Sequence, residues 1–503
     1  MSNHYAALII GSGQGGGPLA QAFANAGKRT ALIESSHVGG TCINEGCTPT
    51  KTMIASGRAA YTACGAKAMG IEFKKSSLQL NIETVRKRKR AIVKSFREGS
   101  EKRIKDTANL DLIMGTAKFL SSNEVEVTLN EDSTKEVLTA DRIFINAGCS
   151  PGPLRIKDTD VIEPVNLLTS TSIMELSNTP RHLLVIGGGP IGVEFAQLFR
   201  RFGSQISIVQ RSAHLLPNED PDISEEMEKI LKEDGITLHL GAQPQWFSKV
   251  PTGSIVLQIK TAQGETKSIL ASHVLNATGR TPNTAALNLE AADIKTDARG
   301  FIVVNEHLET TAPDVYALGD IKGGPAFTHI SYDDFRILKH NLVSHTTSAP
   351  LSTKDRVVPY CVFTDPQLGR VGLTETQAHK LYPPAYPTNA TNGTPASEED
   401  LTPTSENPTA APCRIKTASM PMSWVARALE INEVRGMMKA VVDTETSKIL
   451  GFACLGYEGG ELMSTVQMAM QGGLTWKQLR DMVFAHPCTA EALNNLFSQL
   501  GDD

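Results

Sequence analysis

Short apolar runs and helical segments alternate at the start of the chain. Residues 6–10 read Ala-Ala-Leu-Ile-Ile, an uninterrupted apolar run typical of a buried strand. A glycine-rich turn over residues 11–16 follows, and then an alanine-rich stretch from Pro18 to Ala26 that favours a helix. A second apolar run at 30–33 ends on Glu34. The order strand, glycine turn, helix, strand predicts an α/β unit with a parallel sheet.

The turn itself has the spacing G-x-G-x-x-G, with Gly11, Gly13 and Gly16 at the fixed positions. Such a turn lets backbone N–H groups and the helix N-terminus approach a pyrophosphate. Glu34, at the end of the second strand, is placed to accept hydrogen bonds from ribose hydroxyls. Glycines alone often make only a turn, but the strands and the acid complete a dinucleotide-binding pattern. We therefore predict a dinucleotide site here.

The same pattern occurs a second time. The apolar run 182–186 leads into a turn with Gly187, Gly189 and Gly192, and a helical stretch then reaches the apolar run 205–209. Two such units in one chain predict two bound dinucleotides.

The acid expected after the second unit is replaced by Gln210 and Arg211. A carboxylate there would repel a 2′-phosphate, whereas an arginine can pair with it. We therefore favour NADPH over NADH, with Gln210 and Arg211 as cofactor-binding residues. The alternative is that Arg211 is a solvated surface residue.

Two cysteines, Cys42 and Cys47, follow the first unit in a glycine-rich setting. On one continuous helix they would be about 7.5 Å apart along the axis, beyond the usual Cα separation of a disulfide. If they pair, the backbone must bend between them, and Gly46 and Pro49 suit a bend. A bent, exposed bridge tends to be reducible, which suits catalysis.

Composition narrows the class of protein. At 503 residues the chain is too long for one core and should form about three domains. A net charge of −5 points to neither nucleic acid nor a membrane as partner, and there is no apolar run of transmembrane length. Because the first strand begins at Ala6, we expect no targeting peptide and a cytoplasmic location. The cysteines outside the pair lack metal-ligand spacing, so we expect no bound metal.

A run of five basic residues, from Arg86 to Arg90, suggests a nucleic-acid patch or a targeting signal. The run lies within a helical stretch from Ile82 to Lys105 that also carries glutamates. We therefore predict a solvated helix face.

The two glycine turns, the cysteine pair and four further segments occur in a fixed order along the chain. In these motifs and their order the chain resembles the class I pyridine nucleotide-disulfide oxidoreductases, and within that family the branch of mercuric reductase and dihydrolipoamide dehydrogenase. Glutathione reductase and the hypothiocyanous acid reductases are other members. The resemblance extends from Ala6 to Leu500. The matching segments are residues 277–283, 316–320, 362–367 and the His-Pro-x-x-x-Glu pattern of 486–491.

The resemblance implies an α/β fold with two Rossmann-like dinucleotide-binding domains and an α+β C-terminal dimerisation domain. Residues 383–412 are dense in Pro, Thr, Ser and Asn, and we expect them to be a disordered insertion. The implied domains are 1–152 and 280–349 for FAD, 153–279 for NAD(P)H, and 350–503 for the interface.

The resemblance also implies the path of the electrons. NADPH would reduce FAD, and FAD would reduce a Cys42–Cys47 disulfide, with Cys47 against the flavin and Cys42 facing the substrate. His486, oriented by Glu491, would be the base for Cys42. In the family this pair comes from the partner subunit, so we expect a homodimer with a shared active site.

Lys51 would lie beside the flavin and be held there by Glu194, although either could be a plain surface charge. The other cofactor contacts implied by the resemblance are Thr41, Gly115, Gly148, Gly279 and Asp320.

Three functions remain open. The first is NADPH-dependent reduction of a small disulfide or an oxidised sulfur compound. The second is reduction of a metal or an oxidant, as in mercuric or hypothiocyanous acid reductases. The third is a flavoprotein with a binding role and only incidental diaphorase activity. Mercury reduction is disfavoured because the chain ends without the cysteine pair of mercuric reductases and lacks their N-terminal metal-binding domain. Cys488, where the family usually has threonine, is either a third reactive thiol or an inert side chain.

Overall fold

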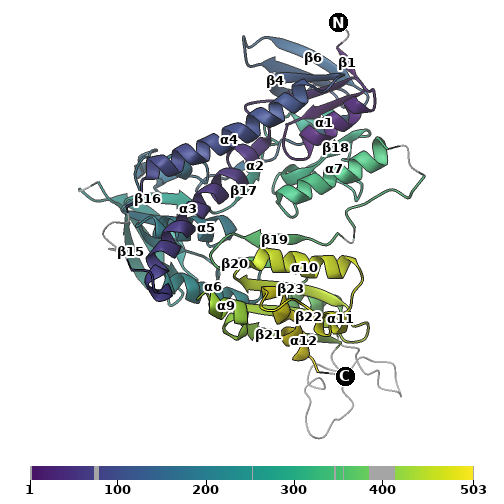
Figure 1. The fold of residues 1–503 in the computed structure, drawn as a ribbon. Coiled ribbons are helices and arrows are strands. Elements are labelled where there is room, and N and C mark those ends of the chain that lie inside the picture. Colours follow the sequence, from purple (N-terminus) through teal and green to yellow (C-terminus); the bar gives the residue numbers. More distant parts are fainter. Residues whose placement is uncertain are drawn as a thin grey trace, which may run out of the picture. The chain divides into compact units, whose positions relative to one another are not determined.

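The computed structural model describes residues 3–72, 79–251, 253–344, 347–354, 356–383 and 414–501. The chain forms two compact units (Figure 1). Unit 1 comprises Met1–Lys67, Glu72–Arg211 and Ile236–Arg356, and unit 2 comprises Ala68–Ile71, Ser212–Gly235 and Val357–Asp503. The insertion expected at 383–412 lies, apart from Pro383, outside the described residues, so its disorder stays a prediction.

The first apolar run forms a central strand of the largest sheet in unit 1. The sheet has the order β1-β6-β5-β4-β3-β2-β7-β18. The strands β4, β3, β2, β7 and β18 run parallel, whereas β4, β5 and β6 form an antiparallel meander. The strands are β1 (His4–Tyr5), β2 (Ala7–Ile10), β3 (Thr30–Glu34), β4 (Leu110–Phe119), β5 (Glu124–Leu129), β6 (Lys135–Ala140), β7 (Ile143–Ile145) and β18 (Val315–Ala317).

Both faces of this sheet are covered, which explains why its parallel strands are continuously apolar. On one face Phe23 of α1 (Gly16–Asn25) packs against Phe144, and Phe144 stacks on Tyr316. The helix α7 (Thr328–Leu342) lies beside α1 (Figure 1). The first strand–turn–helix–strand prediction is therefore confirmed.

The second strand–turn–helix–strand unit also forms as predicted. It belongs to a sheet of order β12-β11-β10-β16-β9, in which all pairs are parallel. The helix α5 (Pro190–Arg201) follows β10. The remaining strands of unit 1 form an antiparallel sheet, β13-β14-β15, and a pair, β17-β8. The bounds are β8 (Cys149–Pro151), β9 (Leu167–Leu168), β10 (His182–Ile186), β11 (Gln205–Val209), β12 (Thr237–His239), β13 (Gln243–Lys249), β14 (Ile255–Lys260), β15 (Thr266–Ala271), β16 (His273–Asn276) and β17 (Arg280–Pro282).

Unit 2 is built on an antiparallel sheet of order β19-β20-β23-β22-β21. The helix α10 packs on β20 and β23, and α12 contacts β21 and β22 (Figure 1). The elements are α6 (Pro221–Glu233), β19 (Pro359–Val362), β20 (Gln367–Gly372), α8 (Glu375–Leu381), β21 (Ile415–Pro421), α9 (Ala426–Glu430), β22 (Met437–Asp443), β23 (Ile449–Gly456), α10 (Gly459–Gln471), α11 (Trp476–Arg480) and α12 (Ala492–Ser498).

A buried charge network attaches the segment 212–235 to the sheet of unit 2. Arg370 on β20, nearly inaccessible to solvent, donates to Asp220 at 3.0 Å and pairs with Glu219. Lys439 on β22 lies 2.8 Å from Asp222 and 2.7 Å from Glu375. Buried cations need such partners, because desolvation without them is costly. These charges explain why α6 groups with the C-terminal sheet.

The basic run 86–90 is helical as predicted, in α4 (Ile82–Lys105), but its predicted solvation is wrong in part. The Lys89 side chain is buried and pairs with Glu175. Arg86 donates to the Glu175 carbonyl at 2.7 Å, and Arg88 donates to the Thr52 carbonyl at 2.9 Å. The run therefore fastens α4 to neighbouring segments of unit 1.

Among the described residues, none of the helices combines the length and hydropathy that a bilayer crossing requires.

Candidate active site

The first glycine turn is shaped by close backbone packing at the carboxyl end of β2. A Cβ on Gly16 would lie 2.1 Å from the Gly11 carbonyl oxygen, so only glycine allows α1 to begin here. Gly13 lies between them in the turn that joins β2 to α1. Carboxyl ends of parallel strands are where α/β sheets bind ligands.

Glu34 is buried and already holds the turn. It accepts hydrogen bonds from the Ser12 hydroxyl at 2.6 Å, from the Ser12 N–H at 3.1 Å and from the Ser36 N–H at 2.8 Å. A carboxylate has about four acceptor positions, so these bonds leave capacity for a ribose hydroxyl.

Asn146, which was not among the predicted site residues, holds the same turn in place. Its side-chain oxygen accepts the Gly16 N–H at 2.9 Å, and its amide nitrogen donates to the Leu318 carbonyl at 2.8 Å. The side chain thereby ties the glycine turn to the end of β18. The feature of the sequence that could have indicated Asn146 is its place as a polar residue directly after the apolar strand β7.

The other predicted flavin contacts differ in their surroundings. Added Cβ atoms at Gly148 and Gly279 would meet no described atom within 4 Å, so both glycines border open space. A Cβ at Gly115 would lie 2.6 Å from the Thr128 carbonyl, so this glycine also serves the packing of β4 on β5. Burial raises the pKa of Asp320, although Arg280 and Lys322 oppose the rise. Thr41 is exposed.

The second glycine turn repeats the first. A Cβ on Gly192 would lie 2.0 Å from the Gly187 carbonyl oxygen, whereas a Cβ on Gly189 would meet no described atom within 4 Å. Gln210 accepts the Gly188 N–H at 3.0 Å and so braces the turn. Arg211 is exposed beside it.

Both turns fit dinucleotides. In each case a glycine turn leads from a parallel strand into the N-terminus of a helix, which is the arrangement that a pyrophosphate needs, and Gly189 of the second turn borders open space. Glu34 is available to one ribose, and Arg211 offers the second site a cation.

The two cysteines lie on two successive helices beside the first turn. Cys42 is on α2 (Gly40–Asn44), and Cys47 is the first residue of α3 (Cys47–Gly65). The helix is interrupted at Glu45 and Gly46, which confirms the predicted bend between the cysteines. A Cβ on Gly40 would lie 2.7 Å from the Gly13 Cα, so α2 begins directly against the first glycine turn.

Both cysteines are free thiols in this structure, and their acidities diverge. The hydrogen bond from Cys42 is the main cause that lowers the pKa of Cys47 to about 6, and Thr328 and Lys51 lower it further against burial. The same bond, together with burial, raises the pKa of Cys42. Position at a helix N-terminus also favours the Cys47 thiolate. In the dithiol form Cys42 is therefore the donor and Cys47 the thiolate.

Lys51 and Glu194 meet, as the sequence analysis expected. Lys51 stands one turn after Cys47 on α3, and its Nζ lies 2.6 Å from Glu194 Oε2 on α5. Glu194 is buried. The helices approach closely at Gly57, where a Cβ would lie 2.8 Å from Leu198 Cδ1. This close approach fixes the carboxylate that holds the lysine.

His486 and Glu491 form a pair in unit 2. His486 Nδ1 lies 2.8 Å from Glu491 Oε2, and the His486 side chain is 69% exposed. The carboxylate fixes one ring nitrogen and leaves Nε2 directed elsewhere, which is how a catalytic histidine is commonly oriented. The cysteines belong to unit 1, so the two halves of the predicted centre lie in different units.

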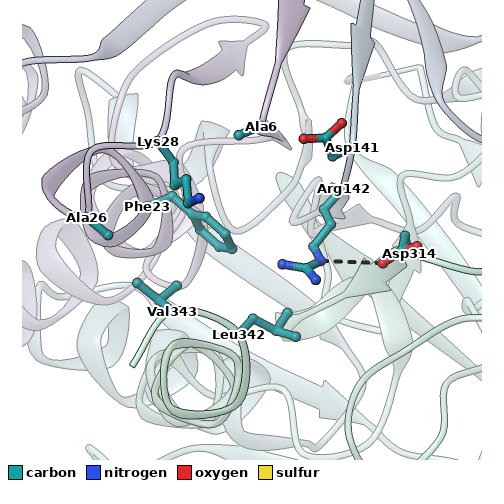
Figure 2. Close-up of a pocket in the computed structure, with 9 residues that line it drawn as sticks. All are labelled: Ala6, Phe23, Ala26, Lys28, Asp141, Arg142, Asp314, Leu342 and Val343. Atoms are coloured by element: carbon teal, nitrogen blue, oxygen red, sulfur yellow. Dashed lines mark hydrogen bonds and ion pairs between the residues drawn. The ribbon is translucent and has the colours of Figure 1, made fainter. Parts of the chain in front are cut away.

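A pocket of about 270 Å³ in unit 1 does not belong to this centre. Figure 2 shows the residues that line it. Ala6, Arg142 and Asp314 precede β2, β7 and β18, so the pocket lies at the amino ends of the strands. The glycine turns and the cysteines lie beyond the carboxyl ends. The lining residues are Ala6, Phe23, Ala26, Lys28, Asp141, Arg142, Asp314, Leu342 and Val343.

Two dinucleotide turns, a polarised cysteine pair and a separate antiparallel unit together define a flavin-dependent disulfide oxidoreductase. The family model described as pyridine nucleotide-disulphide oxidoreductase matches residues 5–334, and its dimerisation domain matches residues 403–497. The chain belongs to the pyridine nucleotide-disulfide oxidoreductase family and is an enzyme. Members of this family use FAD and NAD(P)H.

Relatives share the whole length of the chain. The probable pyridine nucleotide-disulfide oxidoreductase RclA of Escherichia coli K12 is 35% identical over 99% of both chains. A mercuric reductase of Lysinibacillus sphaericus is 34% identical over 98% of this chain and 82% of its own. A dihydrolipoyl dehydrogenase of Thermus scotoductus is 30% identical over 97% of this chain and 96% of its own.

A solved structure agrees with the fold. The Cu(II) complex of the HOCl-induced flavoprotein disulfide reductase RclA from Escherichia coli superposes with a TM-score of 0.82 at 33% identity, over 99% of each chain.

Proposed function

We propose that this enzyme passes two electrons from NADPH through FAD to a Cys42–Cys47 disulfide, and from there to a small disulfide or an oxidised sulfur compound. The observation that carries the proposal is the helix break at Glu45 and Gly46, which sets Cys42 and Cys47 on successive helices beside the first glycine turn. The pKa of Cys47 is lowered and that of Cys42 is raised. A redox dithiol needs this asymmetry, because one sulfur stays as a thiolate while the other exchanges with substrate.

The domain assignment is part of the proposal. Residues 1–152 and 280–349 would bind FAD, residues 153–279 would bind NADPH, and residues 350–503 would form the dimer interface. The two parallel sheets with their glycine turns support the first two assignments. The exposed Arg211 favours the 2′-phosphate of NADPH over the free hydroxyl of NADH.

Bound FAD supplies the two-electron carrier between nicotinamide and sulfur. The Cys42–Cys47 disulfide takes two electrons and one proton, which leaves Cys47 as thiolate and Cys42 as thiol above about pH 6. Cys42 then loses its proton and attacks a substrate disulfide, which releases one thiolate and forms a mixed disulfide. Cys47 attacks the Cys42 sulfur, releases the second thiolate and closes the internal disulfide.

The raised pKa of Cys42 creates the need for a base. We assign this role to His486, held by Glu491, in the partner subunit. The histidine takes the Cys42 proton and returns it to the leaving thiolate. Its exposure in the isolated chain suits a residue that serves another subunit.

A second candidate, reduction of an oxidant or a metal ion, is favoured by the similarity to the HOCl-induced reductase RclA and to mercuric reductases. Cys488 is exposed two positions from His486 and borders a pocket of about 380 Å³ within unit 2. A third thiol there offers a ligand for a soft metal.

Anaerobic titration of the purified holoenzyme with NADPH tests the electron path. We expect two thiols per chain to appear as NADPH is consumed, together with a long-wavelength absorbance from a thiolate beside oxidised flavin. Bleaching of the flavin without new thiols would refute the route through the cysteines.

Substitution of single cysteines tests whether turnover depends on the redox pair. Cys42→Ser and Cys47→Ser should each lower disulfide reduction by at least about a thousandfold while FAD stays bound, because each removes one sulfur of the exchange. Cys64→Ser is the matched control, since Cys64 lies exposed on the same helix α3 and should keep wild-type turnover. Turnover in either redox-pair variant at the rate of the control would contradict the proposed mechanism.

A further inference from the structure

The first residues of two helices in unit 1 are in contact with each other. Cys47 is the first residue of α3, and Thr328 is the first residue of α7, 281 positions later in the chain. The Thr328 Oγ1 lies 3.4 Å from Cys47 Sγ, within hydrogen-bond distance for sulfur. No sequence motif links these residues, and only the fold brings them together.

We propose that Thr328 is a positioning residue of the redox centre, whose hydroxyl donates to the Cys47 thiolate and stabilises this charged form of the sulfur. This inference rests on the proposed function, because it gives the thiolate a role in the cycle. A thiolate can only accept, so the threonine hydroxyl must be the donor once Cys47 has lost its proton.

The first glycine turn fixes both partners. The helix α2, which carries Cys42 and leads into α3, begins against Gly13. The first turn of α7 packs on the neighbouring glycine, since a Cβ on Gly15 would lie 2.7 Å from the Ser331 carbonyl oxygen. Phe327 also accepts the Ile330 and Ser331 N–H groups at 3.1 Å. The helices that carry the hydroxyl and the sulfur are thus both positioned by contacts with the first glycine turn.

The electrostatics agree with this geometry. Thr328 lowers the pKa of Cys47 after the larger effect of Cys42, and in the same direction as Lys51. It also lowers the pKa of Cys42, where the bond to Cys47 and burial outweigh it. Hydrogen bonds to a charged acceptor are among the stronger ones in proteins. Because the sulfur is uncharged in the disulfide, the bond stabilises the reduced pair over the oxidised one. Loss of the hydroxyl should therefore make the pair harder to reduce.

The test uses the full-length protein reduced with excess dithiothreitol. Iodoacetamide alkylation over a pH series, with fragment mass spectrometry, assigns the label to Cys42 or Cys47. The wild type should label Cys47 with a midpoint at a pH of about 6. Thr328→Val should raise this midpoint by about one pH unit and shift the equilibrium with dithiothreitol about tenfold toward the disulfide.

Two further variants isolate the hydroxyl. Thr328→Ser keeps it and should titrate like the wild type, whereas Thr328→Ala should repeat the shift of the valine variant without its branched side chain. Thr50→Val is the matched control, because Thr50 lies on α3 but its hydroxyl bonds Met174 at 3.5 Å. Its midpoint should stay that of the wild type.

An unchanged midpoint in both Thr328→Val and Thr328→Ala would overturn the inference. Equal shifts in the serine and valine variants would overturn it too, because the hydroxyl would not be the cause. Since dithiothreitol replaces NADPH, a shift in the expected direction supports the role of Thr328 even if NADPH fails to generate thiols. That combination would reject the proposed electron path alone.

Discussion

The chemistry depends at the residue scale on how one sulfur is made acidic. The pKa of Cys47 is lowered to about 6 by Cys42, Thr328 and Lys51, against the effect of burial. Glu194 opposes this shift, and it also holds Lys51 in place. Lys51 therefore lowers the pKa of Cys47 from a position that its ion pair with Glu194 fixes.

Lys51→Met should raise the Cys47 pKa, because a nearby cation stabilises the thiolate. A depressed pKa means that the thiolate is present above about pH 6 and is lost as the pH falls through that value. Without the lysine, we expect this window to move upward by roughly half a unit to one unit. The long-wavelength absorbance of the NADPH-reduced holoenzyme, followed against pH, measures the shift.

Lys105→Met is the control for this measurement. Lys105 carries the same charge on an exposed helix end, where it pairs with Glu101, and it is absent from the causes of the Cys47 shift. Identical midpoints for the two lysine variants would contradict the tuning role of Lys51.

At the element scale, α4 supports the helix that carries Cys47. Arg88 on α4 donates to the Thr52 carbonyl of α3, and Thr50 of α3 contacts Met174. Glu175, beside Met174, receives Lys89 and Arg90 from α4. The basic run therefore connects α4 with α3 and with the segment around residue 174 through hydrogen bonds and ion pairs.

Glu175→Gln should destabilise unit 1 by about 1–3 kcal/mol, because it leaves the buried Lys89 without a charged partner. Urea unfolding followed by circular dichroism gives the change. Glu83→Gln removes an exposed i,i+3 partner of Arg86 and should cost less than about 0.5 kcal/mol. Equal effects of the two variants would show that the run is a solvated face after all.

At the scale of the whole molecule, the predicted centre is divided between the units. Unit 1 carries both cysteines, Lys51 and Glu194, whereas unit 2 carries His486 and Glu491. A match to a dimerisation domain over 403–497 covers the second pair. Activity should therefore depend on pairing between chains.

Hybrid dimers test this dependence. Cys42→Ser and His486→Ala homodimers should both be inactive, but an equal mixture exchanged at random should recover about a quarter of wild-type activity, because half the dimers then hold one intact site. A site confined to one chain would give no recovery, since each chain lacks one of the two groups. Disulfide-dependent NADPH oxidation measures the result.

Local patterns were enough for a large part of the fold. The strands at 182–186 and 205–209 and the helix at 82–105 form with the predicted bounds, because apolar periodicity and glycine turns act between neighbours in sequence. The solvated face predicted for 86–90 failed because sequence alone does not show which cations meet a buried partner.

The sequence by itself determined two dinucleotide turns, a redox cysteine pair on a broken helix and the family to which the chain belongs. These features are local, since glycine spacing and the interval between cysteines act over a few residues. Only the tertiary structure decided which sulfur carries charge. That choice depends first on the hydrogen bond between Cys42 and Cys47, and then on Thr328, which reaches Cys47 from 281 positions later in the chain. Hydrogen bonds and charges act over a few ångströms in space, whatever the separation along the chain.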